Sequence, residues 1–160
     1  MPRRNSSTLV PHSAEDMFDL VADVERYPEF LPWCRALRVI NSETEGDQTI
    51  LTADMLVGFR MFRETFRSRV VLDKPALTID TTYIRGPMRH MENIWRFEPH
   101  SSQIDDGATD DSGPTESTVH FGVSFALRNP LLHQAASAVF EEEFARLSEA
   151  FVDRAGEIYA

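Results

Sequence analysis

The sequence predicts one α+β domain, in which a curved antiparallel sheet of six or seven strands wraps around a long C-terminal helix, with short helices after the first strand. Three observations predict this fold. Apolar and polar residues alternate over much of residues 33–125, a helical pattern fills residues 130–155, and proline or glycine separates the segments between them. The 160 residues suit a single domain over 1–160. We expect a helix laid across such a sheet to enclose an apolar pocket.

A short helix is predicted to begin after Ser13. Ser13 suits an N-cap, Asp16 follows three residues later, and apolar residues recur at helical spacing from Met17 to Val24. Two prolines interrupt the chain next. Residues 27–33 are therefore predicted to form a compact, turn-rich connection that carries many aromatic rings.

The following segment has the period of two that is typical of strands. The alternation is clearest at Thr49, Leu51, Ala53, Met55 and Val57. Residues 41–47 and Gly58 supply turns, and later strands are predicted at residues 77–84, 88–97 and 117–125. Strands joined by connections this short pair antiparallel, and a sheet of this size must curl or be covered on one face.

Residues 101–116 differ from the rest of the chain. They carry five acidic residues, no basic residue and one large apolar residue, so they cannot bury enough surface to fold. We expect a disordered acidic loop. The spacing of its acids does not match a calcium-binding loop, and no metal site is predicted.

The last element is predicted to be a long helix with one buried face. Asn129 suits the N-cap, Pro130 suits the first helical position, and no glycine or proline follows until Gly156. Apolar residues recur at about 3.7-residue intervals, which marks one face of a helix. That face is predicted to be buried along its whole length and comprises Ala136, Phe140, Phe144, Leu147, Phe151, Ala155 and Ile158.

The net charge of −10 disfavours binding to nucleic acid through long-range attraction, and no DNA partner is predicted. Local basic clusters remain an open alternative, because arginines gather at Arg60, Arg63, Arg67 and Arg69, and again at Arg85, Arg89 and Arg96.

No catalytic motif stands out, so we expect a protein that is not an enzyme and uses no cofactor or metal. The single cysteine, Cys34, excludes an internal disulfide and is expected to be a small buried residue. The five histidines show no metal-binding spacing, and there is no nucleophile elbow or phosphate-binding glycine loop. Three strand carboxylates could meet in a pocket or lie on the outer face: Asp54, Glu64 and Glu92.

Large apolar residues collect on the predicted concave face of the sheet and on the helix opposite it. Most of them are needed as core. A single helix touches a curved sheet along a limited line, however, and the space left beside it is a natural ligand cavity. The residues concerned are Met55, Phe62, Phe66, Met91, Trp95, Phe97, Phe121 and Phe125, opposed by Phe140, Phe144 and Phe151.

Several motifs resemble those of one family. Residues 27–34, Tyr-Pro-Glu-Phe-Leu-Pro-Trp-Cys, are similar to the signature of the coenzyme Q-binding START-domain family, which lies within the polyketide cyclase/START-like superfamily and includes ribosome-association toxin A. Further similar motifs occur at residues 57–59, 86–87, 93–97, 119–121, 138–140 and 150–155. The resemblance covers nearly the whole chain and implies a START-like helix-grip fold.

The resemblance implies non-catalytic binding of ubiquinone (coenzyme Q), or a related isoprenoid lipid, in support of respiratory electron transport. The implied wall of the ligand cavity consists of Trp33, Met55, Phe62, Phe66, Met91, Trp95, Phe121 and Phe140. Its entrance is expected at Tyr27, Pro28, Phe30, Pro32, Gly58 and Pro87.

The same resemblance implies an alternative partner, the large ribosomal subunit, with subunit joining blocked as the outcome. A cyclase or hydrolase is allowed by the wider fold but has no motif in its favour. The polar N-terminus and the absence of a long apolar segment predict a cytoplasmic protein, with transient contact at the inner face of the membrane.

Overall fold

The computed structural model describes residues 3–31, 33–59, 62–100 and 116–159. Within these ranges a few side chains fall outside the description: those of Phe59, Phe62, His100, Leu132, Ala136, residues 139–145 and Ser148. The acidic segment predicted to be a loop lies outside the described residues from 101 to 115.

Seven strands form one antiparallel sheet in the described part of the chain, which confirms the predicted architecture. Their order across the sheet is β1-β7-β6-β5-β4-β3-β2, so the first strand pairs with the last and the others form a meander. The strands are β1 (Arg3–Val10), β2 (Cys34–Glu45), β3 (Gln48–Phe59), β4 (Phe62–Asp73), β5 (Thr78–Arg85), β6 (Met88–His100) and β7 (Glu116–Leu127).

Among the residues that the structure describes, three helices accompany the sheet: α1 (Ala14–Ala22), the short 3₁₀ helix η1 (Val24–Glu29) and α2 (Pro130–Tyr159). The predicted N-caps are confirmed. The Ser13 hydroxyl accepts a hydrogen bond from the Asp16 N–H at 3.1 Å, and the Asn129 side-chain oxygen accepts one from the Leu131 N–H at 2.9 Å. The predicted turn-rich connection begins in η1 and continues with the Leu31 N–H donating to the Tyr27 carbonyl.

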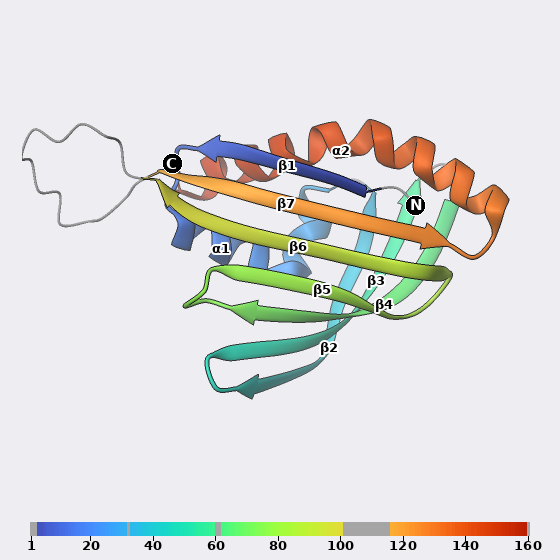
Figure 1. Cartoon of the computed structure of the whole chain (residues 1–160), viewed down its shortest axis with the longest axis horizontal. Helices are drawn as coiled ribbons and strands as arrows, with labels where there is room; N and C mark the ends of the chain where they lie inside the picture. Colours follow the sequence, from blue (N-terminus) through green and yellow to red (C-terminus); the bar gives the residue numbers. More distant parts are fainter. Residues whose placement is uncertain (1–2, 32, 60–61, 101–115, 160) are drawn as a thin grey trace, which may run out of the picture.

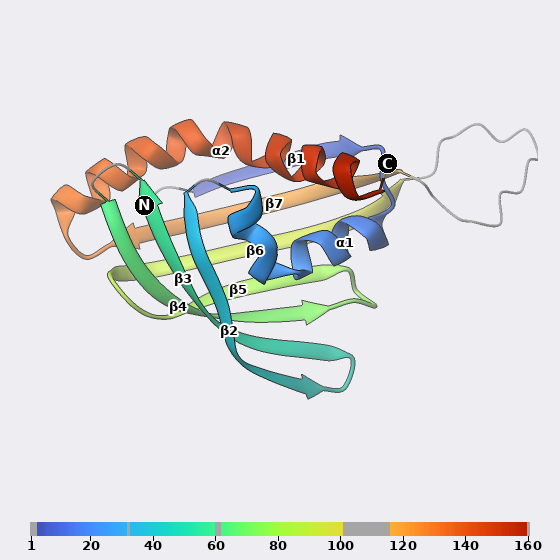
Figure 2. The same cartoon turned by 180° about the vertical axis from the view of Figure 1, so that it is seen from behind.

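The sheet separates an outer face from an inner face that the helices cover. Figure 1 looks onto the outer face, with β7, β6 and β5 in front of α1. From behind, α1 and η1 lie in front of the sheet, and α2 runs along β7 and past the upper ends of β3 and β4 (Figure 2). The helices and the curled sheet thus surround one interior.

The core follows the period of two in the strands. On β6, Trp95 and Phe97 are buried, whereas Ile94, the residue before Trp95, is 44% exposed on the outer face. The α1 residues Met17 and Val21 are fully buried beneath them. Burying these side chains is the main stabilising contribution to the fold.

The predicted buried face of α2 is confirmed for Phe151 and Ala155 but is wrong for Ile158, which is 49% exposed. In that last turn Tyr159 makes the contact with α1 instead, through its hydroxyl, which donates to the Asp16 carbonyl at 2.9 Å. The side chains of Ala136, Phe140 and Phe144 lie outside the described residues.

The two isoleucines of β5 offer a matched test of this core. Ile79 is 2% exposed and Ile84 is 47% exposed. We expect Ile79→Ala to lower the free energy of unfolding by about 2–5 kcal/mol, because it opens space in the core. Ile84→Ala is expected to lower it by less than about 1 kcal/mol. Urea unfolding followed by circular dichroism measures both, and equal losses would contradict the assignment of the two faces.

Candidate functional site

An aromatic cluster fixes α2 to the sheet and to η1. The Phe151 ring packs edge-on against Tyr27 and Phe30, with centroids 5.4 and 5.1 Å away, and lies 5.0 Å from Trp95. Trp95 in turn lies 4.5 Å from Phe121. Edge-to-face geometry at these distances is favourable beyond the area it buries. The helix is therefore held close to the sheet around Phe151.

The segment after η1 is also fixed by polar contacts. Burial raises the pKa of Tyr27, so its hydroxyl stays neutral and donates to the Val21 carbonyl. Arg154 of α2 lies over the Phe30 ring and pairs with Glu29. These contacts close the interior on the side of η1.

Beyond this cluster the interior contains a cavity of about 270 Å³. Its wall is almost entirely apolar and is contributed by η1, α2 and every strand except β1. One end lies at Tyr27, Trp95 and Phe151. The other is lined by Pro87, Met88 and Leu127, close to the connection from β7 to α2. A cavity of this kind suits a hydrophobic small molecule.

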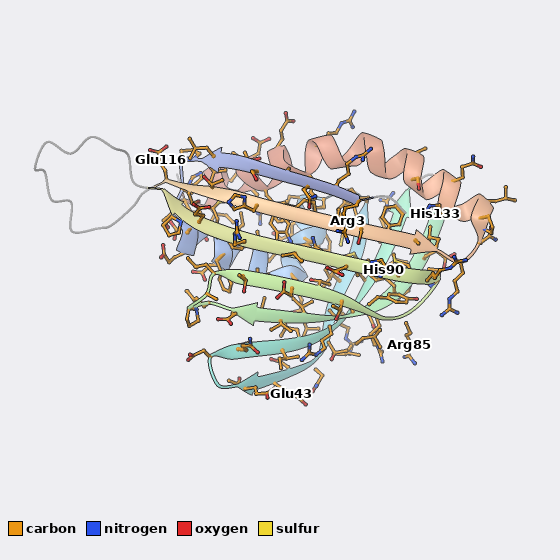
Figure 3. The ribbon with its side chains drawn as sticks, in the orientation of Figure 1. Arg3, Glu43, Arg85, His90, Glu116 and His133 are labelled. Carbon is orange, nitrogen blue, oxygen red and sulfur yellow. The ribbon has the colours of Figure 1, made fainter. Side chains whose placement is uncertain are left out.

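The start of α2 is attached to the sheet beside that second end. The Leu127 N–H donates to Nδ1 of His133 at 3.2 Å, and the Arg128 N–H donates to the Pro87 carbonyl at 3.1 Å. Figure 3 shows His133 at the start of α2 and His90 on β6 nearby. Nε2 of His90 lies 3.0 Å from the Ser124 hydroxyl oxygen. Neither His90 nor His133 lines the cavity.

Six of the eight predicted wall residues lie around the cavity, and their binding of a ligand stays a prediction. The six are Trp33, Met55, Phe66, Met91, Trp95 and Phe121. The side chains of the other two, Phe62 and Phe140, lie outside the described residues.

The predicted entrance is only partly brought together. Tyr27 and Pro87 line the cavity, whereas Pro28, Phe30 and Gly58 do not, and Pro32 lies outside the described residues. Phe30 packs on Phe151 instead. Gly58 serves the backbone: its N–H donates to the Trp33 carbonyl at 2.9 Å, and an added Cβ would lie 2.8 Å from the Arg35 side chain.

The polar part of the wall consists of Glu64, Ser68, Thr81 and Asn93. Sequence reasoning considered Glu64 as a pocket residue but missed Ser68, Thr81 and Asn93. The alternation of side chains along the strands was enough to locate them. Residues two apart on a strand share a face, so the prediction of Phe66 implied Glu64 and Ser68, and the prediction of Met91 and Trp95 implied Asn93.

The three strand carboxylates do not meet. Of these, Glu64 alone lines the cavity. Asp54 receives two hydrogen bonds from the Arg67 guanidinium, at 2.7 and 3.0 Å, which lower the pKa of its carboxyl, with smaller contributions from Arg85 and Arg38. Figure 3 shows Arg85 near the turn from β5 to β6, in the view onto the outer face. These arginines, with Asp54, form what we term the outer arginine cluster.

The described residues contain no group of three side chains placed to hold a metal ion. Their helices include none that is long and apolar enough to cross a membrane. Cys34 is 2% exposed, and burial raises the pKa of its thiol to about 12, as expected for a packed residue rather than a nucleophile.

Residues 10–152 match the family described as polyketide cyclase/dehydrase and lipid transport. Among curated relatives, the ribosome association toxin RatA of Escherichia coli K12 is 32% identical over 160 residues, covering 100% of this chain and 90% of the toxin. The mitochondrial coenzyme Q-binding protein COQ10 homolog B of Xenopus laevis is 30% identical over 156 residues, covering 97% of this chain and 58% of that protein.

Among solved structures, an 18 kDa protein from Caulobacter crescentus is 30% identical and superposes with a TM-score of 0.78. The alignment covers 99% of each chain. The resemblance found in the sequence motifs is thereby confirmed at the level of family and fold.

The burial of Cys34 leads to a labelling prediction. At pH 8 the native thiol is expected to react with iodoacetamide at least about a hundredfold more slowly than the same thiol in guanidinium, because both burial and protonation suppress the thiolate. Mass spectrometry of timed samples measures both rates, and the unfolded protein is the control. Rapid labelling of the native protein would contradict the buried position.

Proposed function

The chain belongs to the polyketide cyclase/dehydrase and lipid-transport family, and on that premise we propose that it binds ubiquinone (coenzyme Q), or a related isoprenoid lipid, without catalysis, in support of respiratory electron transport. The observation that carries the proposal is the apolar cavity between the sheet and α2. The relative named as a coenzyme Q-binding protein supports the choice of ligand.

The size and chemistry of the cavity suit the ring and the first part of an isoprenoid tail. Its volume of about 270 Å³ is close to the lower end of small-molecule sites. Each buried methylene contributes about 0.8 kcal/mol before the cost of association, so affinity does not require many polar contacts. A longer tail extends past Pro87, Met88 and Leu127.

A carrier rather than an enzyme is favoured by the positions of the ionisable groups. Glu64 lines the cavity, whereas Asp54 is paired with Arg67 and Glu92 is not part of the wall. General acid–base catalysis needs a positioned proton donor or acceptor at the reacting atom, often with a partner. Cys34 is a buried, protonated thiol and supplies no nucleophile.

Transient contact with the inner face of the membrane from the cytoplasm fits the end of the cavity near α2. Leu131, in the first turn of α2, is 78% exposed, and Arg128 is exposed close by. An apolar side chain beside a cation is suited to the surface of an anionic bilayer. A lipid could therefore pass between membrane and cavity at this end.

Ligand binding is tested by extraction and by uptake. We expect mass spectrometry of solvent extracts to find a quinone in the purified protein, and calorimetry to detect binding of a short-tailed ubiquinone. Val123→Phe, which fills part of the cavity, is expected to weaken that binding at least about tenfold.

Val71→Phe is the matched control, because Val71 lies on β4 outside the cavity wall. This variant is expected to bind the short-tailed ubiquinone with the affinity of the parent protein. Repeated absence of quinone from the extracts, together with failure to take up added quinone, would contradict the proposed function.

A second candidate function is association with the large ribosomal subunit. The relatives named as ribosome association toxins support it, and the outer arginine cluster is the structural observation in its favour. Arg38, Arg67 and Arg85 come from three different strands and lie around one carboxylate, so positive charge exceeds negative charge there. Arginine forks of this kind bind phosphate groups well.

Sedimentation with ribosomal subunits at low salt tests this candidate. The double variant Arg38→Glu with Arg85→Glu is expected to lose co-sedimentation, because it reverses the charge of the cluster. Arg26→Glu with Lys74→Glu changes charge equally at exposed sites elsewhere and is expected to sediment as the parent protein does. If the parent protein fails to co-sediment, the second function is wrong.

A further inference from the structure

Three of the four polar side chains in the cavity wall lie close together. Ser68 lies on β4, Thr81 on β5 and Asn93 on β6, and all three line the cavity. Thr81 is directly opposite Asn93 in the β5–β6 register, and it is opposite Val70, two residues along from Ser68, in the β4–β5 register. Direct and diagonal neighbours of this kind lie about 5–8 Å apart. We call these three residues the polar belt.

The hydroxyls of the polar belt have hydrogen-bonding capacity that the protein leaves unused. Ser68 is only 6% exposed, and Thr81 is half-buried. Neither hydroxyl has a side-chain hydrogen-bond partner among the residues described. A hydroxyl can donate one hydrogen bond and accept others, so these two side chains suit a ligand that carries polar atoms at the same depth.

The orientation of the Asn93 amide leaves its oxygen as a hydrogen-bond acceptor in the belt. Its Nδ2 lies 3.0 Å from the Gly122 carbonyl oxygen, and only the NH₂ end of an amide can donate there. The Oδ1 end is thereby assigned as a separate acceptor with no donor in the described part of the chain. An amide oxygen accepts hydrogen bonds and never donates, whereas the two hydroxyls can do either.

These capacities distinguish the two redox forms of a quinone. The ring oxygens of the oxidised form are carbonyls and only accept, so the Asn93 oxygen stays unpaired when that form is bound. The reduced form carries two hydroxyl groups, which can donate to Asn93 and accept from Ser68 or Thr81. Glu64 adds another acceptor, but it is four residues from Ser68 along β4, about 13 Å, and lies outside the belt.

We propose that the polar belt binds the hydroxyl groups of a hydroquinone, so that the cavity prefers the reduced form of its ligand to the oxidised quinone. This inference rests on the proposed function and adds to it the chemical form that is carried. The expected preference is about tenfold, which corresponds to about 1.4 kcal/mol, the effect of one additional hydrogen bond between ligand and protein.

Calorimetry under anaerobic conditions tests the preference with a ubiquinone analogue bearing one isoprenoid unit and with its hydroquinone. The two probes have the same carbon skeleton, so the ratio of their dissociation constants reports on the ring oxygens. We expect the hydroquinone to bind about tenfold more tightly. Asn93→Leu is expected to abolish the ratio mainly by weakening hydroquinone binding, because an apolar side chain replaces the acceptor.

Thr81→Val serves as a second variant, because it retains the Asn93 hydrogen bond and nearly the same volume. It is expected to reduce the affinity for both forms. Thr82→Val is its matched control on the exposed side of β5 and is expected to change neither affinity. Equal affinity of the parent protein for the two forms, or a ratio unchanged in Asn93→Leu, would overturn this inference and leave quinone binding standing. Binding of neither form would overturn the proposed function with it.

Discussion

The packing of Phe151 is the interaction on which the rest of the architecture depends. One ring contacts Tyr27 of η1, Phe30 just after it and Trp95 of the sheet. A long helix resting on a curved sheet has few places to be fixed, and here the aromatic contacts gather at one of them. Because the helix is held there, the sheet curls away from it farther along, and the cavity is the space that remains.

The cavity divides the interior residues into those that pack in the core and those that face the space for a ligand. Residues such as Phe97 and Met17 are fully buried in the core, whereas Met55 and Met91 face the cavity and are only half-buried. Methionine adapts its shape readily, so a wall containing it tolerates ligands of varied outline. An apolar cavity left empty forfeits dispersion contacts. A bound hydrophobic ligand restores them, which links occupancy to the stability of the fold.

Much of the fold could be predicted from the sequence because local patterns determine it. The period of two on the strands and the caps at Ser13 and Asn129 each act within a few residues. The turn predicted at Gly58 is wrong, because Gly58 lies inside β3 and pairs with Arg63 of β4. The site was harder to predict. Phe30 and Phe151 meet only because the chain returns after more than a hundred residues, and this contact turns Phe30 away from the cavity wall. Ile158 obeys the helical period, yet Tyr159 makes the contact, because the shape of α1 selects between them. The polar wall residues could have been predicted from the same alternation along the strands that predicted their apolar neighbours.

The pairing of β1 with β7 has a consequence for synthesis of the chain. Ser7 and His120, which contact each other across these strands, are 113 residues apart. At about 5–20 residues per second, a ribosome needs roughly 6–23 s to bring the second strand out after the first. Throughout that interval β1 has no strand neighbour, and only α1 and η1 can cover the apolar face of the β2–β6 meander, because α2 has not yet been made. The nascent protein therefore emerges with an open sheet edge and a partly uncovered hydrophobic face, the two features that chaperones recognise and that aggregation exploits.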